Sequence, residues 1–312
     1  MPVFFWTVLG ILLILVFGGA FVFLKACVRR KELPWMVEEE LKKTSFGKYY
    51  NCIIASDAWL KAHNAQDVYV QSKDGLRLHG YWIPADNPRG TVLLAHGYRS
   101  TMLVDFGLAF AFYYTLGMNI LVPEQRAHGS SEGRYITFGI KESEDMLQWI
   151  AYHNAHFGKY QIILSGMSMG ATTVLYLADR DVPANVKCII ADCGFTSPWD
   201  ILSKVFREVT HLPAFAFLWI TDLFTRLFAG FSLKGKDTRT VLSKAKLPVL
   251  LIHGGSDNFV PCQMSREGYE ACTADKDLLI VQNAGHGVSF LNDRQSYTAK
   301  LIAFLEKYLE GF

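Results

Sequence analysis

Hydrophobic and polar positions divide this chain of 312 residues into three parts. The first is an uninterrupted apolar run over residues 3–24, VFFWTVLGILLILVFGGAFVFL, which is long enough to cross a hydrocarbon core of about 30 Å. A charged stretch with a helical pattern follows, and from about residue 67 the apolar runs are short and strand-like. The pattern therefore predicts a transmembrane anchor over residues 1–25, a helical juxtamembrane connector over 26–66 and a folded domain over 67–312.

Basic residues beside the apolar run indicate the orientation of the anchor. They follow its C-terminal end: Lys25, Arg29, Arg30 and Lys31. By the positive-inside rule, we expect the folded domain to be cytoplasmic. A cleaved signal peptide is the alternative, because Gly18 and Ala20 suit a signal peptidase. The run is too long for a signal peptide and has no basic segment before it, which favours the anchor.

The folded part alternates strand-like and helix-like segments. A hairpin comes first, because VYVQS and LRLHGYWIP flank a turn at Asp74 and Gly75. Six apolar runs then alternate with helical stretches: TVLLAH, MNILVP, QIILSG, KCIIADC, PVLLIHG and LLIVQNAG. Strands that are apolar throughout are typical of a sheet covered on both faces. The pattern predicts an α/β fold with a mostly parallel central sheet and covering helices.

One long interval interrupts this alternation between Asp192 and Pro248. Its simpler interpretation is a pair of amphipathic helices packed on the sheet, and the sharper one is a helical cap insertion over a site, at about residues 195–245. A cap would line the site with its aromatic side chains: Phe215, Phe217, Trp219, Phe224 and Phe228. The second half is also apolar enough to rest on a membrane surface, with Arg226 and Lys234 as its nearby cationic anchors.

The sequence GMSMG at residues 166–170 fits two unrelated patterns. G-x-S-x-G is a nucleophile turn of hydrolases, whereas G-x-x-x-G is a packing face between membrane helices. Here the strand-like QIIL precedes the motif and a helical stretch follows it, which is the setting that a nucleophile turn requires. That helix soon reaches Asp179, Arg180 and Asp181, so it is no apolar membrane segment. We therefore predict that Ser168 is a nucleophile.

Partners for a serine nucleophile follow later strands in the expected order, with the acid before the histidine. Asp257 follows PVLLIHG, and His286 follows LLIVQ. A serine hydroxyl needs a base to take its proton, and an imidazole needs a carboxylate to orient it. Asp192, at the end of CIIAD, is an alternative acid because its strand ends at the same edge of the sheet. Alone, His286 and Asp257 are ordinary turn residues; with Ser168 at matching strand ends they predict catalysis.

A tetrahedral intermediate needs two donors for its oxyanion, and backbone N–H groups supply them without reorganisation. We predict that they belong to Met169, directly after the nucleophile, and to Tyr98, in the loop after TVLLAH. His96 is expected to shape that loop. His128 is expected to be a hydrogen-bonded loop residue rather than a second base.

Composition narrows the chemistry. The net charge of +2 is close to balance, and no basic stripe with interleaved aromatic residues suggests nucleic acid as a partner. The six cysteines have neither C-x-x-C spacing nor the density of a disulfide scaffold, which favours unpaired thiols in a reducing compartment. For the chemistry predicted at Ser168 we expect no cofactor and no metal.

The motifs LAHGY, EQRAHGSSEG, GMSMGA, HGGSDNFVP and AGHG, in this order, resemble the α/β-hydrolase superfamily. Within it the sequence is similar to the branch of monoacylglycerol lipases, small carboxylesterases and serine-aminopeptidase-like hydrolases, including bacterial members with one N-terminal membrane anchor. The resemblance implies the α/β-hydrolase fold from about residue 67 to the end. It also implies the same triad and oxyanion donors, and a cap that sets specificity. Glu124 departs from the family, which usually has Asp there, so we expect the geometry of that loop, rather than catalysis, to differ from the family pattern.

Together these patterns predict a membrane-anchored serine hydrolase that cleaves a carboxylic ester through an acyl-enzyme. An apolar cap near a bilayer suggests a lipid or monoacylglycerol as the small-molecule substrate. Amide or thioester hydrolysis on the same triad is the enzymatic alternative. A membrane-anchored binding module that retains the fold is the non-enzymatic alternative.

Overall fold

A central sheet organises the structure, a computed structural model that describes residues 2–30, 38–44, 46–158 and 160–312. The strands are β1 (Gln66–Gln71), β2 (Arg77–Ile83), β3 (Gly90–Ala95), β4 (Met118–Pro123), β5 (Ile162–Met167), β6 (Val186–Asp192), β7 (Val249–Gly254) and β8 (Lys276–Val281). They form one eight-stranded sheet in the order β1-β2-β4-β3-β5-β6-β7-β8. The β1–β2 and β2–β4 pairs are antiparallel and all later pairs are parallel. The predicted hairpin and the mostly parallel sheet are confirmed.

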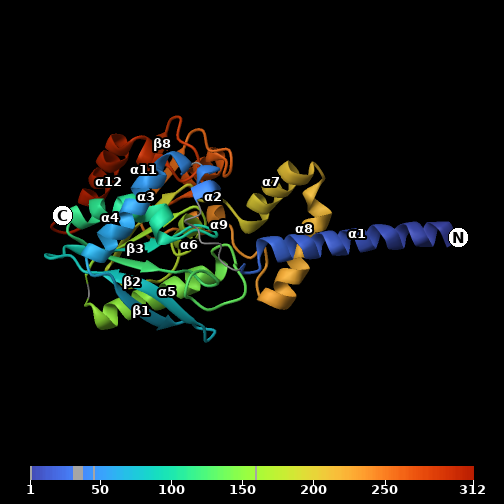
Figure 1. Cartoon of the computed structure of the whole chain (residues 1–312), viewed down its shortest axis with the longest axis horizontal. Coiled ribbons are helices and arrows are strands. Elements are labelled where there is room, and N and C mark those ends of the chain that lie inside the picture. The colour runs from blue at the N-terminus through green and yellow to red at the C-terminus, as the bar shows by residue number, and fades with distance from the viewer. Residues whose placement is uncertain (1, 31–37, 45, 159) are drawn as a thin grey trace.

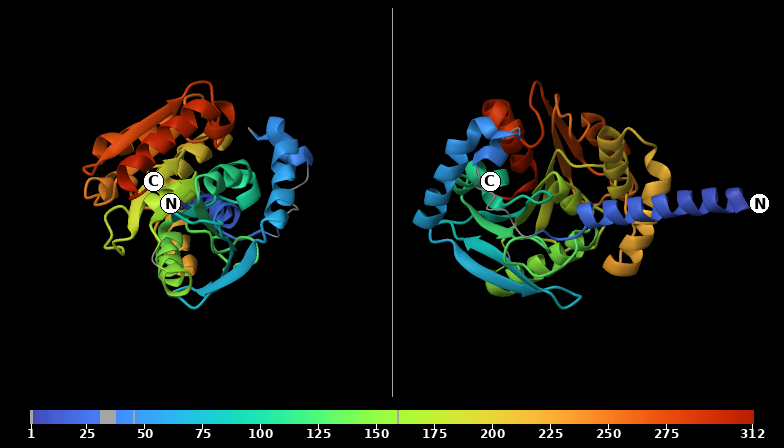
Figure 2. Two further views of the ribbon diagram at one scale, coloured as in Figure 1. Left: turned by 90° about the vertical axis from the view of Figure 1, so that its left-hand side faces the viewer. Right: turned by 45° about the vertical axis from the view of Figure 1, so that its right-hand side comes forward.

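Helices cover both faces of the sheet, as Figure 2 shows. One face packs against α3 (Tyr50–Ala62), α4 (Met102–Thr115), α11 (Ser289–Asn292) and α12 (Arg294–Tyr308). The other packs against α5 (Ile140–His156), α6 (Met169–Leu175), α9 (Thr238–Leu242) and α10 (Cys262–Ala271).

Residues of β3 show why its sequence is apolar throughout. Val92 and Leu94 belong to the core under the first set of helices, and Leu93 and Ala95 belong to the core under the second set. Successive side chains of a strand point to opposite faces, so both alternating sets of β3 are buried. Because the strands from β3 to β8 run parallel, their C-terminal ends and the loops that follow them lie along one edge of the sheet.

The predicted connector over 26–66 is described in part, and Lys31 lies outside the described residues. Its described helices are α2 (Glu38–Lys42), the short η1 (Gly47–Tyr49) and α3. Ile53 and Leu60 of α3 are buried in the core shared with α4. The helical part of this segment therefore contributes to the folded body.

The first helix, α1 (Pro2–Ala26), extends away from the rest of the molecule with the N-terminus at its far end (Figure 1). It is the one helix in the described part of the chain that is long and apolar enough to cross a membrane, a property that signal sequences share. Gly19 and Phe23 of α1, and Cys27 directly after it, are buried and are spaced four residues apart. One face of the C-terminal end of α1 therefore packs against the domain.

The interval between β6 and β7 forms α7 (Pro198–Thr210), α8 (Ala214–Phe224) and a π-helical turn, η2 (Thr225–Ala229), before α9. We call α7, α8 and η2 the cap. The side chain of Ser197 accepts the N–H of Asp200 at the start of α7, and His211 ends the helix in a left-handed conformation. Figure 1 shows the cap beside the base of α1.

Candidate active site

Ser168 lies in a strained turn between β5 and α6. Its φ of 55° and ψ of −115° lie outside the regions that residues with a side chain prefer. A Cβ on Gly166 would lie 2.2 Å from the carbonyl oxygen of Gly170, and one on Gly170 would lie 1.8 Å from that of Ala95. Both glycines are therefore required for the turn to fit between the helix and the neighbouring strand β3.

Three side chains meet at this turn. His286, in the loop after β8, has Nε2 2.9 Å from Oγ of Ser168 and Nδ1 2.7 Å from Oδ2 of Asp257, which follows β7. Asp257 is buried, and the His286 side chain is 20% exposed. In this geometry Nδ1–H donates to the carboxylate and Nε2 accepts the serine proton.

Asp257 is held by more donors than His286 alone. Its Oδ1 accepts the N–H groups of Phe259 and Val260, each at 2.8 Å. Nε2 of the buried His253 lies 3.2 Å from Oδ2 and also 2.9 Å from the carbonyl oxygen of Val260. Burial acts to raise the pKa of Asp257, but the hydrogen bonds from His253 and His286 outweigh burial and hold that pKa well below its usual range.

Asp192 lies behind the turn instead. Its backbone carbonyl accepts the N–H of Ser168 at 2.8 Å, whereas its carboxylate accepts the Ser289 hydroxyl at 3.3 Å. Among the hydrogen bonds of the described residues, Oδ2 of Asp192 has no partner. Burial raises the pKa of this carboxyl from 3.8 to about 6. The structure thus brings Asp257, and not Asp192, into contact with His286.

Comparisons with known proteins agree with this architecture. A family model described as alpha/beta hydrolase fold matches residues 90–208. The chain is 28% identical over 238 residues to YqkD, an uncharacterised protein of Bacillus subtilis, covering 76% of this chain and 78% of YqkD. The esterase Pf2001 of Pyrococcus furiosus superposes with a TM-score of 0.64 at 22% identity, covering 80% of this chain and 92% of the esterase. The chain therefore has the α/β-hydrolase fold.

The fold is also found in the acylaminoacyl peptidase of Pyrococcus horikoshii, with a TM-score of 0.55 at 19% identity over 80% of this chain and 43% of the peptidase. The predicted α/β-hydrolase fold is therefore confirmed. Solved structures this distant in sequence share the fold, and the chemistry has to be argued from the site of this chain.

The loop after β3, residues 96–100, lies against the predicted nucleophile, since a Cβ on Gly97 would lie 3.4 Å from Cβ of Ser168. We call it the oxyanion loop. Met169 is the first residue of α6, so its N–H has no partner within the helix. The hydrogen bonds among the described residues also leave the N–H of Tyr98 without an acceptor. Half-buried Asp105 holds the loop, because its carboxylate accepts the N–H of Gly97 and the hydroxyl of Ser100, both at 2.6 Å.

Two buried histidines, one in each loop, join the oxyanion loop to the loop after β4. Nε2 of His96 accepts the N–H of Gln125 at 3.0 Å, and Nε2 of His128 accepts the N–H of Arg99 at 2.9 Å. The Gln125 amide also donates to the carbonyl of His96. Burial lowers the pKa of His128 to about 3, so its ring is neutral and Nε2 serves as an acceptor. Neither histidine contacts Ser168 in this arrangement.

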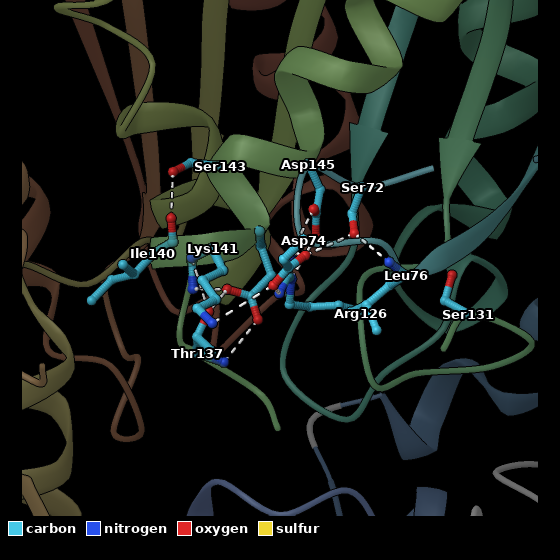
Figure 3. Close-up of polar contacts among 12 residues, drawn as sticks. Ser72, Asp74, Leu76, Arg126, Ser131, Thr137, Ile140, Lys141, Ser143 and Asp145 are labelled. Carbon is cyan, nitrogen blue, oxygen red and sulfur yellow. Dashed lines mark hydrogen bonds and ion pairs between the residues drawn. The ribbon is translucent and has the colours of Figure 1, made fainter. Parts of the chain in front are cut away.

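An ion-pair network fixes the loop after β4, which carries His128. Figure 3 shows Arg126 between Asp145 of α5 and Asp74 of the β1–β2 turn. Arg126 donates to Asp145 at 2.6 and 2.7 Å and to Asp74 at 2.9 and 3.0 Å. Glu124, where the sequence departs from its family, accepts the N–H of Ser130 at 2.6 Å and so closes the same loop.

A cavity of about 270 Å³ reaches Ser168 and is almost wholly apolar. We call it the Ser168 pocket. Its walls come from α1, the oxyanion loop, α7 and the loop after β7. The lining residues on α7 are Ile201, Leu202, Val205, Phe206, Val209 and Thr210.

The prediction that aromatic residues of the second half of the cap line the site is wrong. None of Phe215, Phe217, Trp219, Phe224 and Phe228 lines the pocket. The reason is the packing of α8: Phe217 and Phe224 contact α1 or α7, and the other side chains are exposed on the surface of the cap.

Within the described residues, one group has the spacing of metal ligands: Cys193, Asp257 and His286. Asp257 and His286 are hydrogen-bonded to each other. Burial raises the pKa of the Cys193 thiol well above its usual value, which opposes the thiolate that a metal requires. The donor chemistry of this group therefore fits a triad better than a metal site.

Proposed function

We propose that this α/β hydrolase is a serine hydrolase that cleaves a carboxylic ester through an acyl-enzyme. The observation that carries the proposal is the hydrogen-bonded series from Ser168 through His286 to Asp257, at 2.9 and 2.7 Å, on a strained turn. Beside it lie the N–H groups of Tyr98 and Met169, which have no acceptor among the described residues. The hydrolase fold and its esterase and peptidase neighbours support the same class of reaction.

The geometry gives each group one role. His286 takes the proton of Ser168 as Oγ attacks the ester carbonyl carbon, and the N–H groups of Tyr98 and Met169 stabilise the oxyanion. His286 then gives that proton to the leaving alcohol oxygen as the carbonyl C–O bond breaks. Water attacks the acyl-enzyme by the same route and releases the acid. Asp257 keeps the proton of the imidazole on Nδ1 and stabilises its cation.

The pocket favours an ester with an apolar acyl chain over a substrate with a free amino group. Within the described residues, Lys25 is the one charged side chain of the lining. An aminopeptidase substrate carries an α-ammonium, which requires a carboxylate or carbonyl partner when it is desolvated. Amide and thioester substrates remain the enzymatic alternative, and a panel of matched esters, thioesters and aminoacyl amides separates them.

A binding module would not account for the strained backbone of Ser168. Unfavourable φ/ψ values persist where the surrounding structure imposes them, and they are concentrated at functional sites. Here the strain directs the hydroxyl toward His286, which a binding surface does not require. Failure of a folded protein to react with a fluorophosphonate would support the binding module instead.

We also propose that α1 anchors the enzyme with its catalytic domain on the cytoplasmic side. The apolar run and the basic residues after it, Lys25, Arg29 and Arg30, support this orientation. Protease digestion of sealed inside-out and right-side-out vesicles tests it: the domain is expected to be cleaved only when the cytoplasmic face is outward.

The decisive test of catalysis is Ser168→Ala. Turnover of p-nitrophenyl butyrate is expected to fall by up to about a million-fold in kcat, because the triad acts as a unit. Ser165→Ala is the matched control, since Ser165 lies in β5, the strand that leads into the turn, and its hydroxyl is 3.4 Å from that of Tyr113 rather than near His286. Unchanged turnover in Ser168→Ala would refute the proposal.

A further inference from the structure

We propose that α1 is a wall of the Ser168 pocket as well as an anchor, and that the pocket opens inside the membrane leaflet. Its substrate is then an ester whose acyl chain already lies in the membrane and slides against α1. This inference rests on the proposed serine hydrolase function and names the substrate class of that site.

Residues of α1 line the pocket directly. Phe21, Val22, Lys25 and Ala26 form one side of the cavity, opposite the apolar residues of α7. Ser168 lies in the same lining. An acyl chain that extends from Ser168 into this cavity therefore contacts α1 within the pocket itself.

The end of α1 is also attached to the oxyanion loop. The Tyr98 hydroxyl donates to the carbonyl of Ala26 at 2.8 Å. The Arg99 guanidinium donates to the carbonyls of Lys25 at 2.8 Å and Val28 at 3.1 Å. These carbonyls belong to the last turn of the helix and the segment after it, so the oxyanion loop supplies their hydrogen-bond donors. The position of α1 is thus tied to the catalytic loop.

The cap packs closely on the same part of α1. A Cβ on Gly18 would lie 2.5 Å from the Phe217 ring, and one on Gly19 would lie 2.6 Å from Ile220 of α8. The Thr221 hydroxyl lies 3.1 Å from the carbonyl oxygen of Gly19. Small residues and a hydroxyl between helices are typical of helix packing in membranes.

The length of α1 places this contact inside the membrane. None of the fifteen residues over 3–17 is buried, and they extend for about 22 Å at 1.5 Å per residue. A hydrocarbon core of about 30 Å needs roughly five more residues. Those residues begin with Gly18 and Gly19, which α8 covers, so a spanning α1 draws α8 and the adjoining part of the pocket into the edge of the leaflet.

The surface of the cap fits that position. Exposed apolar side chains lie along α8 and η2, next to the exposed face of α1: Phe215, Trp219, Leu223, Leu227 and Phe228. Phe215 is 65% exposed and Leu227 67%. Nζ of Lys234 lies 4.0 Å from the ring centroid of Trp199 and 4.1 Å from that of Trp219. Tryptophan with lysine is a common pair at the level of lipid headgroups.

The first experiment measures chain-length preference with Val22→Trp in the full-length enzyme in lipid vesicles. Val22 lines the pocket, so the larger ring excludes part of a long acyl chain and leaves a short one in place. We expect the ratio of kcat/KM for p-nitrophenyl palmitate to that for p-nitrophenyl butyrate to fall at least about tenfold. Val16→Trp is the matched control, because Val16 is 41% exposed on α1 and outside the lining. Its ratio is expected to match the wild type.

A thermal unfolding transition like that of the wild type shows that Val22→Trp is folded. An unchanged palmitate-to-butyrate ratio in that variant would overturn the role of α1 in the pocket, while leaving the serine hydrolase proposal intact. A wild-type protein that hydrolyses neither ester would instead refute the proposed function, and this inference with it.

The second experiment tests the depth of the cap without catalysis. Vesicles with lipids brominated on their acyl chains quench tryptophans that lie among those chains. The contribution of one tryptophan is the fluorescence of the wild type minus that of the variant that lacks it. We expect the brominated lipids to quench the contribution of Trp219, taken from Trp219→Phe, by at least half. The contribution of Trp59 on α3, taken from Trp59→Phe, is expected to be unaffected. An unquenched Trp219 contribution would place the cap outside the leaflet and overturn the inference.

Discussion

Asp257→Asn is a sharp test of the site because the structure fixes how the amide must turn. Oδ1 accepts two backbone N–H groups, from Phe259 and Val260, at 2.8 Å. In the variant the amide oxygen has to take that position, since the NH₂ group would otherwise face two donors. The NH₂ group then lies where Oδ2 lies now, 2.7 Å from Nδ1 of His286.

This orientation imposes the wrong tautomer on His286. Nδ1 must accept from the amide, so the proton moves to Nε2 and faces Ser168, where it cannot act as a base. A wrong tautomer in a serine triad costs about 10⁴-fold in kcat, or about 5.4 kcal/mol of transition-state stabilisation. We expect that loss with little change in KM, since Asp257 does not line the pocket.

The assay is kcat and KM for p-nitrophenyl butyrate, with thermal unfolding of both proteins to show that the variant is folded. Asp192→Asn is the control, because Asp192 is the other carboxylate predicted from the sequence and does not contact His286. Its kcat is expected to stay within a few-fold of the wild type. A loss below tenfold in Asp257→Asn, or a thousand-fold loss in Asp192→Asn, would refute this reasoning.

Gly170→Ala is expected to lower kcat at least about 100-fold in a folded protein, because its Cβ would meet the Ala95 carbonyl at 1.8 Å and displace the turn; normal labelling by a fluorophosphonate would contradict this. Burial raises the pKa of Asp192 from 3.8 to about 6, so the folded state binds this proton more tightly than the unfolded state does. The contribution of that proton to the free energy of unfolding is therefore lost as pH rises from about 4 through 6. Urea unfolding is expected to show that the free energy of unfolding of Asp192→Asn, relative to that of the wild type, rises by about 2 kcal/mol between pH 4 and pH 8; a pH-independent difference would contradict it.

The fold was predictable because its signals are local. Each strand of the parallel part is apolar on both faces, and the glycines around Ser168 fit one kind of turn. The order of Asp257 and His286 along the chain follows from the order of the strands. These features require only a few neighbouring residues, so the sequence alone was sufficient to propose them.

The supporting residues were harder to predict because they act across the fold. His253 lies within the apolar strand β7, where the sequence gives no function for a histidine. Its role becomes clear only in the fold, which brings its ring to Asp257. Asp105 resembles an ordinary acidic residue in the first turn of a helix, and its role depends on how the oxyanion loop folds back over α4.

The sequence also did not predict that α1 and α7 line the Ser168 pocket, because that lining depends on contacts across the fold. Aromatic content pointed to the second half of the cap, whereas the packing of α8 on Gly18 and Gly19 turns those side chains toward α1 or to the surface. That contact joins residues about 200 positions apart along the chain. The spacing of apolar residues within either helix does not encode it.

The most direct test of the central claim is to map the adduct of a fluorophosphonate on the full-length protein by mass spectrometry. We predict one phosphonyl group per chain, on the peptide that contains Ser168, and its absence from Ser168→Ala. An adduct on another residue, or a folded wild-type protein that forms none, would contradict the assignment of Ser168 as the nucleophile.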